Sequence, residues 1–149
     1  MTPTAADVRR ARILAGLAAG ESYTTIADGL GVRTGTVGDW VYELTARVGV
    51  PDRAALVSYA YHVGWLALPD RPATTFPCPL PYLRRALVCI ALGMTDRQTA
   101  ARLGISLRTA QTYGERLRAH YGARHRAHAV ALAHQHHHLP TNLTTRSSS

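Results

Sequence analysis

Between residues 108 and 116 the chain carries polar side chains that match the hydrogen-bonding edges of DNA bases. Arginine can pair with guanine O6 and N7, glutamine with adenine N6 and N7, and glutamate with cytosine N4, while threonine can pack on a thymine methyl. Their spacing of i, i+3, i+4, i+7 and i+8 places them on one face of a helix. The residues of this face are Arg108, Gln111, Thr112, Glu115 and Arg116. The face is a candidate for reading bases, and the simpler alternative is a polar helix surface that contacts only solvent.

Apolar residues on the opposite side of this segment predict the helix that positions the face. The positions expected to be buried are Ala110, Tyr113, Gly114, Leu117 and Tyr121. Ser106 can cap the start of this helix, and Thr95 can cap a shorter helix before it. A short helix, a three-residue turn and a longer helix have the spacing of a helix-turn-helix.

Further polar side chains near these two helices suit contacts with DNA phosphates. Such contacts position a protein on the duplex but carry no sequence information. The candidates for this role are Arg97, Ser106, Thr109 and Arg118. Together with the face between residues 108 and 116, they form the predicted DNA-binding set.

The formal net charge of +8 resides in the second half of the chain. Residues 1–70 contain six arginines against seven acidic residues, whereas residues 71–149 contain eleven arginines against two acidic residues. A half with this charge favours a polyanionic partner such as nucleic acid. A solvated basic surface without a ligand is the alternative.

The sequence contains two copies of one unit at a constant offset, the one that separates Gly20 from Gly93. At this offset Leu30-Gly31 aligns with Leu103-Gly104, and the register continues over some fifty residues without a gap. Residues 66–79 hold four prolines, which predict a semi-extended linker. We therefore predict an all-α protein with two four-helix units, residues 4–65 and 80–138, and a disordered tail, residues 139–149. Asp7 is the expected cap of the first helix.

Both units resemble the LuxR-type (GerE-type) helix-turn-helix DNA-binding domain, which has four helices. The resemblance rests on "AAGESYTTIADGLGVRTGTVGDWVYELTARVGVPDRAALVSYA" and on "ALGMTDRQTAARLGISLRTAQTYGERLRAHYGARHRAHAVALA". It implies sequence-specific binding of double-stranded DNA in bacterial transcription regulation. It also implies that the third helix enters the major groove and that the fourth often serves dimerisation. Gln111 departs from the pattern because the family has a lysine there.

The first unit has few cations on the face equivalent to residues 108–116. That region contains Arg33, Thr34, Thr36, Asp39 and Tyr42, with two glycines among them. Phosphates would repel Asp39, so we interpret the second unit as the DNA reader. Weaker DNA contact, dimerisation and binding to another protein are the roles left open for the first unit.

Three aromatic residues on and after the expected fourth helix of the first unit suit an interface, where aromatic side chains are enriched. These residues are Tyr59, Tyr61 and Trp65. The alternative is that they close the core of their own unit. Such a face would fit two kinds of partner: a second copy of this chain, which would give a homodimer, or the transcription machinery.

Seven of the eight histidines lie in the last thirty residues. The pairs His125/His128 and His134/His138 could each share a helix face, but they have no cysteine or carboxylate ligands nearby. We expect a solvated histidine-rich helix end, no metal site and no cofactor. Cys89 is expected in a helix core and Cys78 in the linker.

Catalysis is not expected, because the sequence holds no motif-anchored nucleophile with its base, no carboxylate pair and no phosphate-binding glycine loop. It also shows no membrane span and no secretory signal, so we expect a cytoplasmic, nucleoid-associated protein. The main hypothesis is a DNA-binding regulator. The alternative is a protein-interaction adaptor that binds RNA polymerase, a sigma factor or another regulator through degenerate helix-turn-helix units.

Overall fold

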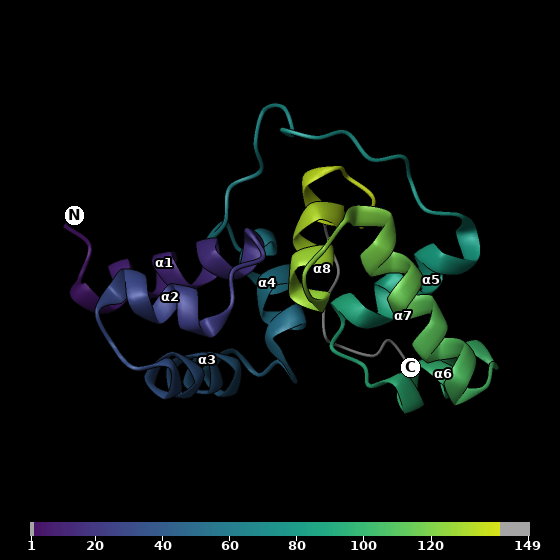
Figure 1. Ribbon diagram of the computed structural model, residues 1–149, viewed down its shortest axis with the longest axis horizontal. Helices are drawn as coiled ribbons and strands as arrows, with labels where there is room; N and C mark the ends of the chain where they lie inside the picture. Colours follow the sequence, from purple (N-terminus) through teal and green to yellow (C-terminus); the bar gives the residue numbers. More distant parts are fainter. Residues whose placement is uncertain (1, 141–149) are drawn as a thin grey trace.

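Residues 2–140, the part of the chain that the computed structural model describes, fold into eight α-helices without a β-strand (Figure 1). The all-α prediction is confirmed for these residues. None of their helices is both long and apolar enough to cross a membrane. The helices are α1 (Ala5–Ala18), α2 (Tyr23–Leu30), α3 (Thr34–Val48), α4 (Arg53–His62), α5 (Pro81–Ala91), α6 (Asp96–Leu103), α7 (Leu107–Tyr121) and α8 (Arg126–Gln135).

Most of the predicted disordered tail, from residue 141 onward, lies outside the described residues. At the start of that tail the prediction is wrong, because Leu139 is only 4% exposed. Its side chain belongs to the buried apolar cluster, so the chain beyond α8 still packs on the core there.

The helices repeat along the chain at the same offset as the sequence. Helices α2, α3 and α4 begin and end at positions equivalent to the ends of α6, α7 and α8, respectively. Helices α1 and α5 also end at equivalent positions, but α5 begins three residues later than the offset predicts. Pro81 is its first residue, a position that suits proline because a first-turn N–H has no partner within the helix.

The start of α1 differs from the expectation that Asp7 is its cap, which is wrong. Thr4 is the N-cap, and its hydroxyl accepts a hydrogen bond from Asp7 N at 3.1 Å. The Asp7 carboxylate accepts from Thr4 N at 3.0 Å in return. This capping box satisfies two backbone donors at once, which explains why the acid stands three residues inside the helix. Thr95 and Ser106 cap their helices as predicted, and Ser22 caps α2.

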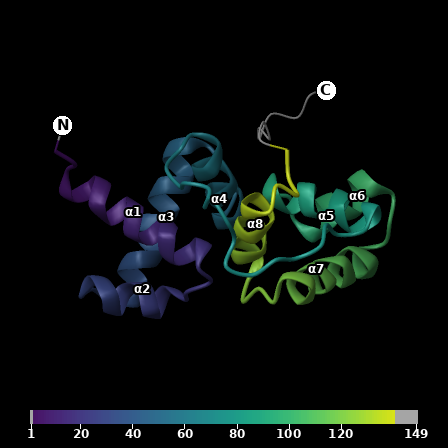
Figure 2. The same ribbon diagram turned by 90° about the horizontal axis from the view of Figure 1, so that it is seen from above.

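The two halves of the chain pack through equivalent helices. Helix α4 lies against α8, and this contact is flanked by α1 on α8 and by α5 on α4. Figure 2 shows α4 and α8 in the middle of the molecule, with the other helices of each half on the outside. Because α1 is equivalent to α5 and α4 to α8, the packing is nearly symmetrical. One cluster of buried apolar side chains runs through both halves.

Two equivalent glycines allow this close approach. Gly20 and Gly93 both have a left-handed backbone, with φ of 82° and 81°. A Cβ at Gly20 would overlap the His128 imidazole, and a Cβ at Gly93 would lie 3.0 Å from Ala55 Cβ. Ala55 and His128 are themselves equivalent positions of the two copies. In each half, the glycine at this equivalent position therefore leaves room for the fourth helix of the other half.

The centre of the α4–α8 contact is an aromatic stack between equivalent residues. The rings of Tyr61 and His134 lie 5.3 Å apart at an interplanar angle of 25°. His134 Nε2 lies 2.8 Å from Ser58 Oγ, and Gln135 Nε2 donates to the Tyr61 hydroxyl at 2.9 Å. The expectation of a solvated histidine-rich end is wrong for His134 and for His138, which are only 7% and 8% exposed. Packing against the other half buries the first of them.

The aromatic residues singled out in the first half make contacts within the chain. Tyr59, Tyr61 and Trp65 are all partly buried against the common core. The Tyr59 and Trp65 rings meet edge-on at 5.5 Å, and the Arg10 guanidinium lies 4.1 Å from the Trp65 ring centre. Their role as an interface with a second molecule stays a prediction.

The segment between α4 and α5, residues 63–80, contains no helix and arches over the molecule (Figure 1). Hydrogen bonds from histidines hold part of this segment against the second half. His136 Nε2 lies 2.6 Å from Thr74 O, and His120 Nε2 lies 2.6 Å from Pro77 O. Cys78 in this segment is exposed, and Cys89 in α5 is buried, as predicted. Burial raises the pKa of the Cys89 thiol.

Candidate nucleic-acid interface

Helix α7 is held in place by its apolar side. Ala110, Leu117 and Tyr121 are at most 3% exposed, and Gly114 is also buried. Tyr113 is half-buried and packs against the Tyr82 ring of α5 at 5.0 Å. Four of the five positions predicted to be buried are so, and the fifth is covered in part. The orientation of α7 about its axis follows from these contacts.

The opposite side of α7 faces solvent. Arg108, Gln111, Glu115 and Arg116 are exposed, and Thr112 is half-buried. The Thr112 hydroxyl donates to Arg108 O at 3.0 Å. A shallow depression on this side brings together most of the predicted reading residues. It is lined by Ser106, Leu107, Arg108, Gln111, Thr112 and Glu115.

Arg116 is set apart from the other residues of this face. Its Nη1 donates to the Tyr82 hydroxyl at 3.2 Å, which draws the side chain toward α5. It does not line the depression that holds Arg108 and Gln111. The helical spacing places all five residues on one face, but the contact with α5 separates one of them.

The predicted phosphate contacts lie at three different places. The Ser106 hydroxyl accepts from Thr109 N at 3.0 Å and donates to Thr109 Oγ1 at 2.8 Å, which leaves the Thr109 hydroxyl hydrogen available. Arg97 is exposed near the start of α6, outside the depression on α7. Arg118 is exposed one turn beyond Glu115 and lines a second groove.

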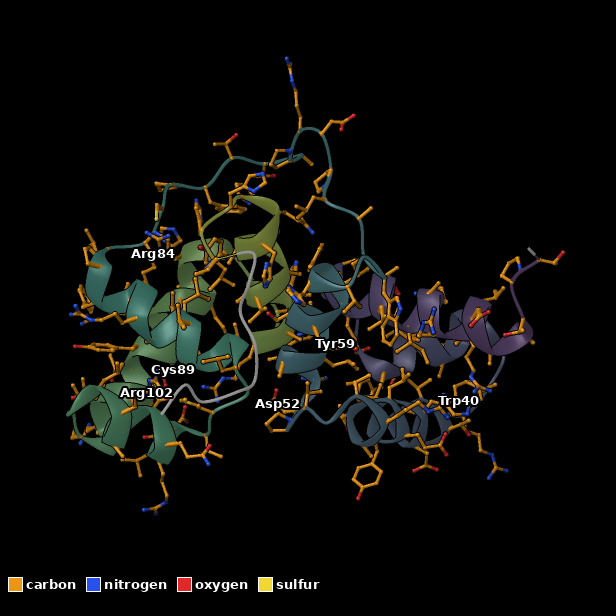
Figure 3. The ribbon with its side chains drawn as sticks, turned by 180° about the vertical axis from the view of Figure 1, so that it is seen from behind. Trp40, Asp52, Tyr59, Arg84, Cys89 and Arg102 are labelled. Carbon is orange, nitrogen blue, oxygen red and sulfur yellow. The ribbon has the colours of Figure 1, made fainter. Side chains whose placement is uncertain are left out.

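This second groove lies between the two halves of the chain. Figure 3 labels Asp52 at the end of α4 that borders it. Gln111 and Glu115 line both the groove and the depression on α7, so the two surfaces are continuous. The groove is lined by Asp52, Arg53, Ala54, Asp96, Gln111, Gly114, Glu115, Arg118, Arg124, His125 and Arg126.

Imidazoles cap the helix that begins at this groove. His125 Nδ1 accepts from His128 N at 3.0 Å, in the place where Asp52 caps α4. His128 Nδ1 in turn accepts from Arg124 N at 3.1 Å. Burial lowers the pKa of both imidazoles, and for His125 the nearby Arg53 guanidinium lowers it further. These two histidines therefore cap α8, and no cluster of three metal-ligating side chains occurs among residues 2–140.

The equivalent side of α3 in the first half looks different. Asp39 and Tyr42 are exposed, Tyr42 to 74%, and the Thr34 hydroxyl donates to Thr24 Oγ1 at 3.3 Å. Thr36 is half-buried, and Arg33 is exposed at the N-cap position of α3 without a side-chain capping bond. The face therefore offers one cation, and that cation is at its edge.

Sequence reasoning missed the arginines that the groove adds to α7, namely Arg53 and Arg124. Arg53 belongs to the near-neutral half, and Arg124 precedes a helix for which the resemblance implies dimerisation. The repeat held one signal, because Arg53 and Arg126 occupy equivalent positions. Only the packing of α4 beside α8 shows that Arg53 lies near α7.

The chain matches no protein-family model, no curated protein and no solved structure. The resemblance to LuxR-type domains stays a prediction from the sequence pattern. A functional proposal for this protein therefore rests on the arrangement of its own residues.

Proposed function

We propose that this protein binds double-stranded DNA in a sequence-specific manner and regulates transcription, with α7 in the major groove. The observation that carries the proposal is the exposed side of α7, where Arg108, Gln111 and Glu115 are held in one shallow depression. These side chains have the donors and acceptors that distinguish base pairs in the major groove. A nucleoid-associated, cytoplasmic location is part of the proposal.

The proposed architecture is a pair of LuxR-like four-helix units, residues 4–65 and 80–138, joined by a linker at residues 66–79. Two observations support it: the helices recur at the offset of the sequence repeat, and α4 packs on α8 with near symmetry. In this arrangement one chain forms the equivalent of a dimer. The fourth helices provide the contact between its units.

The unequal charge of the halves supports an unequal division of labour. Residues 71–149 carry eleven arginines against two acidic residues, and α7 belongs to this part. Asp39 is exposed on the face of α3 that would meet DNA, where phosphates would repel it. We therefore assign base reading to α7 and a supporting role to the first half.

The test is selection of bound fragments from a random pool of duplexes with the full chain. Wild-type protein is expected to enrich one sequence pattern. Arg108→Ala combined with Gln111→Ala is expected to lose the pattern while it keeps weak binding to all duplexes. A matched control on the other half is Thr34→Ala combined with Tyr42→Ala, which is expected to enrich the same pattern as wild type. Enrichment of no pattern by wild-type protein would contradict the proposal.

One observation favours the adaptor as a second candidate function. Tyr42 is 74% exposed on α3, although tyrosine is enriched at protein interfaces and carries a large apolar ring. An adaptor would hold RNA polymerase, a sigma factor or another regulator through this face. Its signature would be loss of that partner in Tyr42→Ala, together with no steep salt dependence of duplex binding.

A further inference from the structure

The groove between the halves carries cations that the proposed α7 interface does not use. Arg53 begins α4 in the near-neutral half, and Arg124 precedes α8. Both line the groove opposite or beside Arg118 of α7. Gln111 and Glu115 line the groove as well as the exposed side of α7. A duplex held on α7 would therefore pass the mouth of this groove.

Arg53 and Arg126 occupy equivalent positions in the two halves, but only Arg126 is neutralised. Its Nη2 lies 2.9 Å from Asp96 Oδ1. Tyr23 stands in the first half where Asp96 stands in the second, and the Arg53 guanidinium lies 5.3 Å from the Tyr23 ring centre. An aromatic ring attracts a guanidinium through its quadrupole without cancelling the charge. The exchange of acid for tyrosine thus leaves Arg53 positioned by a ring contact and without a carboxylate partner among residues 2–140.

The acidic side chains of the groove are largely engaged in other contacts. Asp96 pairs with Arg126, and Asp52 caps α4 by accepting from Ala55 N at 2.9 Å. Asp52 and Glu115 have no arginine partner among residues 2–140, and Asp52 keeps its negative charge when it caps the helix. Against these two carboxylates stand three arginines that have no carboxylate partner among the same residues: Arg53, Arg118 and Arg124. The groove is therefore suited to an anion.

We propose that this groove holds backbone phosphates of the duplex bound at α7, with Arg53 and Arg124 as direct phosphate contacts. The first half of the chain would then touch DNA through the start of α4 and not through α3. This inference rests on the proposed function. Arginine suits the role because its planar guanidinium pairs with two phosphate oxygens at once. The contact with the Tyr23 ring orients the Arg53 side chain before DNA binds.

The test is the salt dependence of duplex binding by the full chain. Loss of one phosphate contact lowers the slope of log K against log salt by about 0.9. We expect Arg53→Gln and Arg124→Gln each to lower the slope by about 1 and to weaken binding to selected and scrambled duplexes by the same factor. Arg71→Gln removes an exposed arginine outside the groove and is expected to leave the slope unchanged. Arg53→Lys keeps the charge and is expected to retain most of the slope.

Thermal unfolding of each variant shows whether the fold is kept, and the comparison is made among variants that unfold like wild type. An unchanged slope in both Arg53→Gln and Arg124→Gln overturns the inference. If that happens while Arg108→Ala with Gln111→Ala still abolishes the sequence preference, the proposed function stands without it. Failure of wild-type protein to bind any duplex overturns the proposed function itself.

Inorganic phosphate separates DNA from a small anion as the occupant of the groove. Under the proposal, phosphate competes weakly and only at concentrations that also screen the duplex. The inference is wrong if phosphate alone binds the protein and Arg53→Gln removes that binding without changing the DNA salt slope. The groove would then be a site for a free anion.

Discussion

Gln111 and Arg118 lie two turns apart on α7 and are assigned different tasks. Gln111 is exposed in the depression that would face base edges, whereas Arg118 turns into the groove between the halves. We expect Gln111→Ala to relax the preference at one base pair by about 1 to 3 kcal/mol. Arg118→Ala is expected to weaken binding to every duplex alike. Affinities for a panel of duplexes with single base-pair changes measure both effects, and identical profiles for the two variants would contradict the assignment.

His134 makes the stability of the protein depend on pH. Burial lowers the pKa of its imidazole to about 4, and nearby His62 contributes in the same direction. The neutral form is therefore favoured in the fold, while the unfolded chain takes up a proton near pH 6.5. The contribution of His134 to the free energy of unfolding is therefore present in full above pH 6.5, and it is lost as the pH drops from 6.5 toward 4.

The loss due to His134 between pH 7.5 and 4.5 amounts to about 2 to 3 kcal/mol. Urea denaturation at the two pH values measures it. We expect His134→Gln to be less stable at pH 7.5 and to lose about 2 to 3 kcal/mol less than wild type on acidification. The pKa values of His125, His128 and His138 are lowered as well, so part of the acid sensitivity remains in the variant. An equal loss in variant and wild type would contradict the role of His134.

Histidines are the residues whose setting is hardest to predict from the sequence. The run at residues 134–138 has the composition of a solvated helix end, yet His134 and His138 are buried. His134 is covered by Tyr61 and Ser58, which belong to the other half of the chain. No local pattern reports such a contact. By contrast, the exposure of Arg108 and Gln111 follows from the helical period alone, because the apolar side of α7 packs on the core and the opposite side faces solvent.

At the scale of the helix, Gly114 weakens α7 without a packing reason. A Cβ at Gly114 would meet nothing within 4 Å, because the residue lines the groove between the halves. We expect Gly114→Ala to raise the free energy of unfolding by about 0.5 to 1 kcal/mol, the helix-propensity difference. Thermal denaturation measures the gain.

Gly104 provides the matched control for this prediction. A Cβ there would also meet nothing within 4 Å, but its φ is +66° because it ends α6 in the left-handed conformation. We expect Gly104→Ala to destabilise the protein by about 1 kcal/mol. Destabilisation by Gly114→Ala would contradict the open groove beside α7 and would show that the groove is closed in solution.

Helix positions are largely predictable, because caps and apolar periods are local signals. Ser106 and the stripe from Ala110 to Tyr121 place α7 correctly. The predicted cap of α1 is wrong because Thr4 and Asp7 are both good caps, and their reciprocal hydrogen bonds decide which one stands outside the helix. The packing of α4 against α8 could not be predicted from the sequence of either helix, because each helix is short and apolar on more than one side.

For the whole molecule, the contact between the halves depends on Gly20. Gly20 and Gly49 have nearly the same backbone, with φ of +82° and +79°. A Cβ at Gly20 would overlap His128 of the other half, whereas a Cβ at Gly49 would meet nothing within 4 Å. We expect Gly20→Ala to cost about 1 to 3 kcal/mol more than Gly49→Ala, because only the first also overpacks the interface.

Denaturant titrations of the two glycine variants measure this difference. A single unfolding transition is expected for wild type, since one apolar cluster runs through both halves. Equal losses for the two variants would mean that the halves do not pack in solution as described. The near symmetry of the α4–α8 contact would then have no bearing on function.

Competition binding with the full chain shows whether α7 reads DNA sequence. A labelled duplex carrying the selected pattern is challenged with the same duplex scrambled, for wild type and for Arg108→Ala combined with Gln111→Ala. We expect wild type to prefer the selected duplex by at least tenfold, or about 1.4 kcal/mol, and the double variant to prefer neither. Binding of no duplex by wild type, or an unchanged preference in the double variant, would contradict base reading by α7.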